Sequence, residues 1–352
     1  MEAEEEACAE GRRRPQGRWV EDRLTLGDNV HTESFLFLDG RSRGSMRAPT
    51  KSGVWRVPPG YRRLSFVSFV EARQAALLCR RQGKPPADWT EDEVLRNAKF
   101  CNIDRRDDAV TAELLTALEA APKWQLRERV LLAASLRFTG SRRGEASILA
   151  GLIEAGLHVD ADGNDTPLRA ALRRGEVRCG SGTYQMSLNR TQIATVIERT
   201  ADAVVAHVHA NGQFRDVLEA ADFVAEQMTV GKRPQFSANE TAKDFAYIAG
   251  LMQSLSHRRC HLGPGARKGL VLVRSQQAQL HGLSEDEAVE CLCGQLRERH
   301  SLAWIETIDV EQALCEFSKY EAYVTNGVSS VKQYRPALGL AAAPAEGSKC
   351  KA

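Results

Sequence analysis

Residues 66–78 read FVSFVEARQAALL, and this stretch decides the type of fold that the sequence predicts. Positions of one helical face recur in it at intervals of three and four: Phe66, Phe69, Val70, Arg73, Leu77 and Leu78. Such spacing is the period of an amphipathic α-helix, whereas a half-buried strand alternates every second residue. Strand-like alternation is scarce elsewhere in the chain, and neither an internal repeat nor a heptad pattern occurs. We therefore expect an all-α fold.

Local signals predict where further helices begin and end. The runs 90–93 (TEDE) and 284–287 (SEDE) have the form of a capping box, in which a hydroxyl and a glutamate satisfy the free N–H groups of a helix start. At 165–167 (DTP), a capping residue precedes a proline suited to the first helical turn. Glycines suited to end helices stand at Gly140, Gly156 and Gly175.

The chain divides into a helical domain and flanking segments. Residues 1–30 are charged and poor in large apolar side chains, which predicts a disordered tail. Residues 31–60 form an irregular extension, in which the apolar run 35–38 (FLFL) is a strand or an anchor. The helical domain is expected at 61–325. Residues 336–352 are rich in alanine, glycine and proline and predict a second disordered tail.

The overall charge does not by itself indicate a partner. Lysine and arginine number 48 against 46 aspartates and glutamates, a net charge of +2. Arginine, which binds phosphate through two parallel hydrogen bonds, occurs in short clusters. We expect most of these clusters to be solvated faces, and we assign phosphate binding only beside a suitable turn. The run 12–14 (RRR) is either a nuclear signal or part of a tail.

Cysteine usage and hydropathy restrict the class of protein. Nine cysteines are spread without a Cys-x-x-Cys pair, which argues against a zinc site and for a reducing compartment inside the cell, the nucleus in a eukaryote. We expect no bound structural metal. No apolar run approaches 18 residues and residues 1–10 are acidic, so we expect neither a membrane span nor a secretory signal.

The first candidate site lies in residues 99–111 (KFCNIDRRDDAVT). If this segment is helical, Asn102, Arg105, Asp108 and Thr111 share one face. Such a face can hold a phosphate or the edge of a base. The other interpretation is a salt-bridged surface helix.

The second candidate site is the run 261–270 (HLGPGARKGL). Gly263 and Gly265 flank a proline at a helix start, where free N–H groups attract an anion, and Arg267 and Lys268 add positive charge. This arrangement is similar to the hairpin of helix-hairpin-helix proteins, which holds the DNA backbone without reading its sequence. The other interpretation is a plain turn between helices.

The third candidate site lies in residues 307–320 (TIDVEQALCEFSKY). Asp309 stands where a helix would begin, which predicts an N-cap, and Glu316 and Lys319 are spaced to pair with each other. Helix-hairpin-helix glycosylases also place a carboxylate at the helix start after their hairpin, where it faces the flipped nucleotide. Both interpretations of Asp309 are open.

Other chemistry is not indicated by the remaining residues. No serine triad and no paired-histidine metal spacing occurs. His207 and His209 are two positions apart, which is wrong for one helical face, and we expect them to be structural. Cys101 and Cys315 are expected to be buried core thiols.

Taken together, these segments resemble one family, over roughly residues 60–325. The opening is similar to the helical domain of hydroxymethyl-deoxyuridine DNA kinase and to the alpha-glutamyl/putrescinyl thymine pyrophosphorylases. The matching blocks are 69–73, 83–85, 89–92, 99–111, 182–184, 236–245, 263–270, 309–311 and 314–320.

The resemblance implies a fold akin to helix-hairpin-helix DNA glycosylases. It also implies action on 5-hydroxymethyluracil in DNA, in which phosphate or pyrophosphate on the hydroxymethyl oxygen makes a leaving group. A base inside a duplex hides its 5-substituent, so the nucleotide must be flipped out. Phosphoryl transfer needs a metal and charge neutralisation, which implies ATP and Mg²⁺ as cofactors. The implied metal ligands are Asp108, Asp244, Asp309 and Glu316.

Each candidate residue has a role under this resemblance. Asn102 and Arg105 would hold the base or its phosphate, and Asp309 would be the general base or a metal ligand at the hydroxymethyl oxygen. The implied catalytic set is Asp108, Asp309, Glu311 and Glu316. The implied substrate-binding and DNA-binding set is Asn102, Arg105, Asp244, Gly263, Gly265, Arg267, Lys268, Lys319 and Tyr320.

The sequence departs from the family pattern in two places. No Gly-x4-Gly-Lys-Ser/Thr run occurs in the 352 residues, so either a separate P-loop kinase supplies phosphoryl transfer or this module does different chemistry. A thymine or methylcytosine hydroxylase is a further expected partner, beside DNA. Bifunctional glycosylases carry a lysine at the position of Arg267, and arginine stays protonated, so we expect no lyase activity through a Schiff base there.

Three functions follow as hypotheses. The first is an enzyme that modifies hydroxymethylated thymine in DNA. The second is a monofunctional glycosylase that removes a modified base, in which Asp309 stabilises the developing cation on the sugar. The third is a reader without enzymatic activity, which flips and holds a modified base for a partner.

Overall fold

The computed structural model describes residues 54–139, 145–156, 166–177, 189–228, 235–253 and 259–329. Within these ranges the secondary structure is helical, apart from two isolated β-bridges, and the fold is all-α as predicted. The α-helices are α1 (Phe66–Arg81), α2 (Glu93–Asn97), α3 (Ala109–Ala120), α4 (Leu126–Thr139), α5 (Glu145–Ala155), α6 (Pro167–Arg174), α7 (Arg190–Asn211), α8 (Val217–Gln227), α9 (Gln235–Phe245), α10 (Pro264–Gln276), α11 (Glu285–Arg297) and α12 (Thr307–Asn326). Short 3-10 helices lie at η1 (Pro86–Asp88), η2 (Arg105–Asp107), η3 (Ala278–Leu280) and η4 (His300–Leu302).

The structure confirms the helix that the spacing of apolar residues in 66–78 predicts, as α1. Phe66, Phe69 and Val70 are fully buried, and Leu77 is nearly so, because they share one face of the helix. Leu78 lies outside this face and is 44% exposed, so its assignment to the core was wrong. Ser65 caps the helix by accepting a hydrogen bond from the N–H of Ser68.

Several predicted helix ends are confirmed by their geometry. Ser284 and Glu287 form the expected reciprocal capping box at the start of α11. Thr166 caps α6, with Pro167 in its first turn. Gly175 ends α6 in the left-handed conformation at φ 77°, where a Cβ would be strained, and α5 ends immediately before Gly156. Gly140 and Asp165 lie outside the described residues.

Two predicted caps are wrong in detail. Asp92 caps α2, not Thr90: its Oδ1 accepts the N–H of Leu95 at 2.8 Å, while the Thr90 hydroxyl accepts the N–H of Asp92 at 3.1 Å. At α12 the N-cap is Glu306, and Asp309 lies one turn inside the helix. Asp309 reaches back to accept the N–H of Glu306 at 2.9 Å, so it satisfies the helix start from within.

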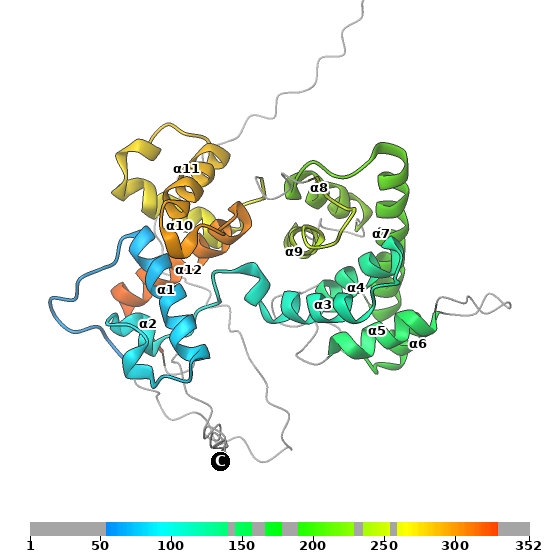
Figure 1. The fold of residues 1–352 in the computed structure, drawn as a ribbon, viewed down its shortest axis with the longest axis horizontal. Coiled ribbons are helices and arrows are strands. Elements are labelled where there is room, and N and C mark those ends of the chain that lie inside the picture. The colour runs from blue at the N-terminus through cyan, green and yellow to red at the C-terminus, as the bar shows by residue number, and fades with distance from the viewer. Residues whose placement is uncertain are drawn as a thin grey trace, which may run out of the picture. The chain divides into compact units, whose positions relative to one another are not determined.

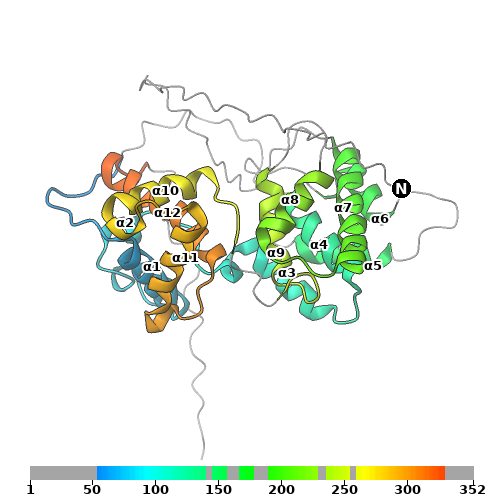
Figure 2. The same ribbon diagram turned by 90° about the horizontal axis from the view of Figure 1, so that it is seen from above.

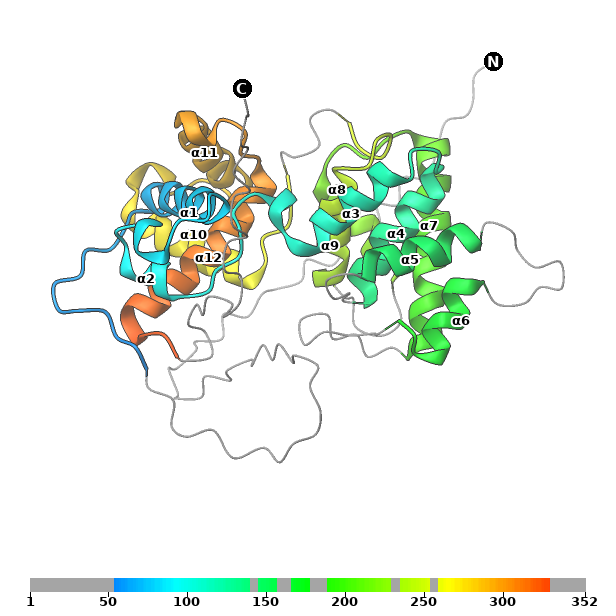
Figure 3. The ribbon, with the colours of Figure 1, turned by 60° about the horizontal axis from the view of Figure 1, so that its bottom comes forward.

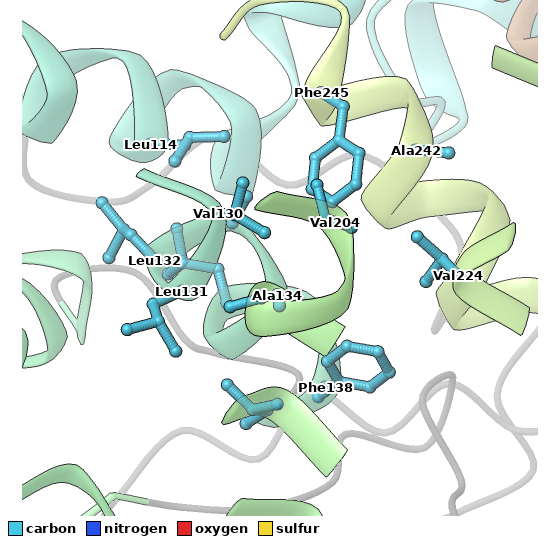
Figure 4. Packing of buried hydrophobic residues seen from close by; sticks show 14 of the residues in the cluster. Leu114, Val130, Leu131, Leu132, Ala134, Phe138, Val204, Val224, Ala242 and Phe245 are labelled. Carbon is cyan, nitrogen blue, oxygen red and sulfur yellow. The ribbon is translucent and has the colours of Figure 1, made fainter. Parts of the chain in front are cut away.

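One group of helices packs around the larger hydrophobic core. Helix α4 packs against α5, α7 and α9, and α8 lies along α9; these neighbours are visible in Figure 1 and in the turned view of Figure 3. Figure 4 shows Phe138 of α4 and Phe245 of α9 among the aliphatic side chains of this core. Because almost every residue from Val130 to Thr139 is buried, α4 forms the centre of this group.

A second core joins the beginning and the end of the described chain. It contains apolar residues of α1, α2, α10, α11 and α12, which gather together in Figures 1 and 2. Phe66 and Phe69 meet Phe317 of α12 edge to face, with ring centres 5.5 and 5.4 Å apart. Trp55 and Val328 are paired by two backbone hydrogen bonds, which hold the segment before α1 against the end of α12.

The close packing of α10 on α12 depends on two glycines. A Cβ on Gly265 would lie 2.6 Å from the Cys315 Sγ, and one on Gly269 would lie 2.0 Å from the Leu314 carbonyl oxygen. The Cys315 side chain could rotate away from a Cβ on Gly265, but the Leu314 backbone cannot, so Gly269 accepts only glycine at this spacing. The glycines of the predicted phosphate-binding run therefore have a role in helix packing.

The expected tails and the matches at 182–184 lie outside the described residues, as does most of the 31–60 extension. All the described residues belong to one compact unit. The predicted limits of the helical domain, 61–325, stay a prediction, although the described helices run from Phe66 to Asn326.

Candidate functional site

The run 99–111 does not form one helix, in contrast to the prediction. Arg105 opens the short helix η2, and Asp108 caps α3 by accepting the N–H groups of Val110 and Thr111. Two aspartate caps, Asp104 and Asp108, lie within five residues and break the helical path between them. Asn102 lies before this break, where its side chain donates to the Asp107 carbonyl at 2.9 Å.

Asp244 is the centre of a buried network of charges. This α9 carboxylate is fully buried and receives hydrogen bonds from two arginines and a hydroxyl. Arg137 of α4 donates through Nε to Oδ2 at 2.6 Å and through Nη2 to Oδ1 at 3.0 Å. Arg105 reaches Oδ1 at 3.2 Å and Thr111 at 2.8 Å. The predicted candidates Arg105, Thr111 and Asp244 therefore meet, although not along one helix.

The same network includes Glu240 of α9 and Asp108, the cap of α3. Arg105 also binds Glu240 at 2.6 Å, and Arg137 binds Asp108 at 3.0 Å. The attraction of Arg105 and Lys243 overcomes the burial of Glu240 and holds the pKa of that carboxyl well below its usual range. Asp108 likewise has a lowered pKa, because Arg137 and Arg105 outweigh the effect of its burial. These acids are therefore ionised and paired at neutral pH.

Lys243 connects this network to α12. Its ammonium group lies 2.8 Å from Glu240 and 2.7 Å from Glu311, and all three residues are buried. The second oxygen of Glu311 accepts the N–H of Gly263 at 3.1 Å. Glu311 thus occupies the N–H group at the start of α10 that would otherwise be offered to a phosphate.

Asp309 differs from Asp108, Asp244 and Glu311, because its oxygens bind backbone groups and not the cations that those three acids bind. Its two oxygens accept backbone N–H groups, from Arg105 at 2.7 Å and from Glu306 at 2.9 Å. Burial disfavours the charge and raises the pKa of Asp309 from 3.8 to about 7, although both hydrogen bonds act in the opposite direction. A carboxyl with this pKa can hold or release a proton near neutral pH, as a general acid or base requires.

Glu316 lies in a separate cluster on α12. It accepts the N–H of Cys101 at 3.0 Å and pairs with Lys319 at 2.5 Å, which confirms the predicted i, i+3 pair. Gln312 binds the carbonyl of Asn102 beside it. The loop before η2 is therefore fastened to α12. Cys101 is exposed and Cys315 is only partly buried, so their assignment as buried core thiols was wrong.

Tyr320 is fully buried, so its side chain is not offered at the protein surface. Its hydroxyl lies 2.9 Å from Asp92 and 2.8 Å from the hydroxyl of Tyr61, and it accepts the N–H of Leu64. Asp92 also caps α2, so this cluster joins α2, α12 and the segment before α1. In this conformation Tyr320 supports the core, and its predicted contact with substrate stays a prediction.

The start of α10 has two exposed basic side chains. Arg267 forms a surface ion pair with Glu285 at 3.0 Å and remains 55% exposed, and Lys268 is exposed next to it in the chain. Gly263 caps the helix and Pro264 occupies its first turn. Exposed cations at a helix start are suited to phosphate, and the phosphate-binding role of Arg267 and Lys268 stays a prediction.

Sequence reasoning missed Arg137, Glu240 and Lys243. Arg137 was the most detectable, because it stands in the apolar run 130–138 (VLLAASLRF), and an arginine in a buried helix needs a buried acid. Glu240 and Lys243 were detectable only as an i, i+3 pair, which occurs on many solvated helices. No sequence pattern showed which distant residues they meet.

The four implied magnesium ligands do not fit a metal site. Asp108 and Asp244 bind guanidinium groups, Asp309 accepts two N–H groups, and Glu316 binds Lys319 and a backbone N–H. A cation would have to displace these donors. Within the described ranges, no three histidine, cysteine or acidic side chains are grouped as a metal would require.

Comparison with known proteins identifies one similar family. Residues 62–133 match the family model of the helical domain of 5-hmdU DNA kinase. The matched stretch includes Arg105, Asp108 and Thr111 and ends within α4, before Arg137. No curated protein and no solved structure matches the chain. Among the described helices, none combines the length and apolar character needed to cross a lipid bilayer.

Proposed function

We propose that this chain binds DNA and holds a flipped 5-hydroxymethyluracil for phosphorylation at its hydroxymethyl oxygen. The observation that carries the proposal is the match of residues 62–133 to the helical domain of 5-hmdU DNA kinase. The matched stretch supplies the backbone N–H of Arg105 that binds Asp309. It thus leads directly to Asp309, a buried acid whose pKa lies near neutrality.

Asp309 is the proposed proton acceptor for the hydroxymethyl group. A hydroxyl that attacks a phosphoryl group must lose its proton, and a carboxyl with a pKa of about 7 is suited to accept it. The hydrogen bonds to Asp244 would hold Arg105 in place. The backbone N–H of Arg105 would then orient the carboxyl of Asp309. In this proposal, the exposed Arg267 and Lys268 hold the DNA backbone, in an arrangement like that of helix-hairpin-helix glycosylases.

A reader without transferase activity is the second candidate, and a specific observation favours it. Asp108, Asp244 and Glu311 are occupied by cations of the protein itself, so they are not free to hold a metal with a nucleotide. The chain would then present the base to a separate P-loop kinase. Both candidates require modification-dependent DNA binding, and only the first requires turnover by this chain alone.

The deciding experiment incubates the purified protein with ATP, Mg²⁺ and a duplex that carries one 5-hydroxymethyluracil. The nucleosides are then released by digestion and weighed by mass spectrometry. A gain of one or two phosphates supports transfer, and Asp309→Asn should abolish that gain. Transfer that persists in Asp309→Asn would contradict the assignment of the base.

The same digest separates the alternatives. An unchanged base together with selective binding of the modified duplex supports the reader. An abasic site supports a monofunctional glycosylase, in which Asp309 stabilises charge on the sugar. Equal binding to modified and unmodified duplexes, with no change of mass, would contradict the proposed function in each of its forms.

A further inference from the structure

Arg106 and Trp304 form an arginine–aromatic pair near Asp309. The Arg106 guanidinium carbon lies 5.6 Å from the centre of the Trp304 ring, so the two flat groups lie close enough for a cation–π interaction. Arg106 follows Arg105, whose N–H binds Asp309, and Trp304 lies five residues before Asp309 in the chain. Two chain segments therefore bring this pair to the carboxyl that is the proposed proton acceptor.

The polar edges of both side chains are already occupied. Asp104 accepts hydrogen bonds from Nε and Nη2 of Arg106, at 2.9 and 2.8 Å, which also neutralises its charge. The indole N–H of Trp304 donates to the Ser301 carbonyl at 3.0 Å. Yet Arg106 is 51% exposed and Trp304 is only partly buried. What this pair offers a ligand is a flat face rather than a free charge or donor.

We propose that Arg106 and Trp304 form the binding surface for an extrahelical pyrimidine base next to Asp309. This inference rests on the proposed function and names the residues that would hold its substrate. The base stacks on the outer face of Arg106 and continues the stack that Trp304 begins. Because Asp104 occupies Nε and Nη2 of Arg106, the surface favours a neutral ring over a phosphate.

Arg106→Lys is the variant that distinguishes stacking from charge. Lysine keeps the positive charge but loses the planar group, so a stacking site is lost and a phosphate contact is kept. Arg106→Ala removes both. Since Arg106 is a half-exposed side chain on a short helix, both variants are expected to fold, and a thermal melt checks this. The matched control is Arg174→Ala, because Arg174 forms the same kind of two-bond pair with Glu176 on the surface at α6.

The experiment uses two duplexes of the same sequence, with 5-hydroxymethyluracil or thymine at the centre and 2-aminopurine beside it. Anisotropy measures affinity, and a rise in 2-aminopurine fluorescence reports unstacking of the flipped base. We expect Arg106→Ala and Arg106→Lys each to weaken binding of the modified duplex roughly tenfold and to abolish the fluorescence rise, as loss of one stacked base does. Arg174→Ala should behave as the wild type.

Each other outcome has a distinct meaning. If the wild-type chain binds both duplexes equally and gives no fluorescence rise, the proposed function fails before any variant is compared. If the wild type prefers the modified duplex and Arg106→Lys retains that preference, the stacking site is wrong while the proposed function stands. A loss with Arg106→Ala that Arg106→Lys rescues identifies a charge contact and also overturns the stacking site.

Discussion

The buried network around Asp244 and the start of α10 contain the same kinds of residue in opposite surroundings. In the network, Arg105, Arg137 and Asp244 are almost completely buried and bind one another through several hydrogen bonds. At the start of α10, Arg267 is more than half exposed and has one surface partner, and Lys268 is exposed. Both regions were predicted to contact DNA or its base.

The difference teaches that burial decides what a charged residue can do. A buried ion is costly unless it is paired, so each member of the network is committed to its partners and holds the helices together. An exposed ion gains little from its pair and stays available to a ligand. Mutations should therefore lower stability in the network and DNA affinity at α10.

Asp244→Asn should have the largest effect on stability. It leaves Arg105 and Arg137 buried with less opposing charge, so we expect the free energy of unfolding in urea to fall by about 3–5 kcal/mol. Asp202→Asn is the control, because Asp202 is 59% exposed in its pair with Arg127 and should cost less than about 1 kcal/mol. Equal losses for the two variants would contradict the contrast between the regions.

The ionisation of Asp309 should lower the free energy of unfolding as the pH rises. The opposite sign is expected for Asp108 and Glu240, whose pKa values are lowered in the folded chain. Its pKa is about 7 in the folded chain against 3.8 ordinarily, so the folded chain binds the extra proton between these values. The contribution of Asp309 to the free energy of unfolding is therefore complete below pH 4 and is lost as the pH rises to about 7. The total loss over this range is about 4 kcal/mol.

The measurement is urea unfolding of the wild type and of Asp309→Asn from pH 4 to pH 8. The difference in unfolding free energy between them should change with pH over this range, because only the wild type titrates at this position. A constant difference would show that the pKa of Asp309 is not raised.

Gly269→Ala should test the packing that brings α10 to α12. The added Cβ would meet the Leu314 carbonyl oxygen, part of the backbone, so the helices must separate at a cost of about 1–3 kcal/mol. Gly294→Ala in α11 is the control, and it should change the free energy of unfolding in the opposite direction. Nothing lies within 4 Å of its Cβ position, and alanine should stabilise the helix by about 0.5–1 kcal/mol in thermal or urea unfolding. A neutral Gly269→Ala would contradict the close approach of the two helices.

Arg267→Ala combined with Lys268→Ala should have the smallest effect on stability, below about 1 kcal/mol, because only a surface pair is lost. Its effect should appear in DNA binding. Loss of two phosphate contacts should reduce the slope of log K against log salt concentration by roughly 2. An unchanged slope in titrations with duplex DNA would remove the start of α10 from the interface.

The sequence predicted the helices better than the site. The face of α1, the capping box at Ser284 and the end of α6 at Gly175 were all predicted, and the structure confirms them. The predicted helix through Asn102 and Asp108 was wrong, because Asp104 and Asp108 each cap a new helix start. Both aspartates were visible in the sequence, but their caps compete with helix continuation, and periodicity alone does not decide which prevails.

The site depended on contacts between residues far apart in the chain. Arg105 meets Glu240 and Asp244 across more than 130 residues, and its N–H meets Asp309 across 204. Arg106 and Trp304 were not singled out from the sequence, because a stacking pair has no local pattern.

By itself, the sequence determined that the fold is all-α and where many of its helices begin and end. Caps, glycine stops and helical periodicity act over a few residues, so they can be detected without the fold. Only the tertiary structure decided which charges are buried, which are exposed, and which groups each buried carboxyl binds. Those properties depend on the partners that packing brings together and on the water it excludes, and they separate Asp309 from Asp244 although both are buried aspartates.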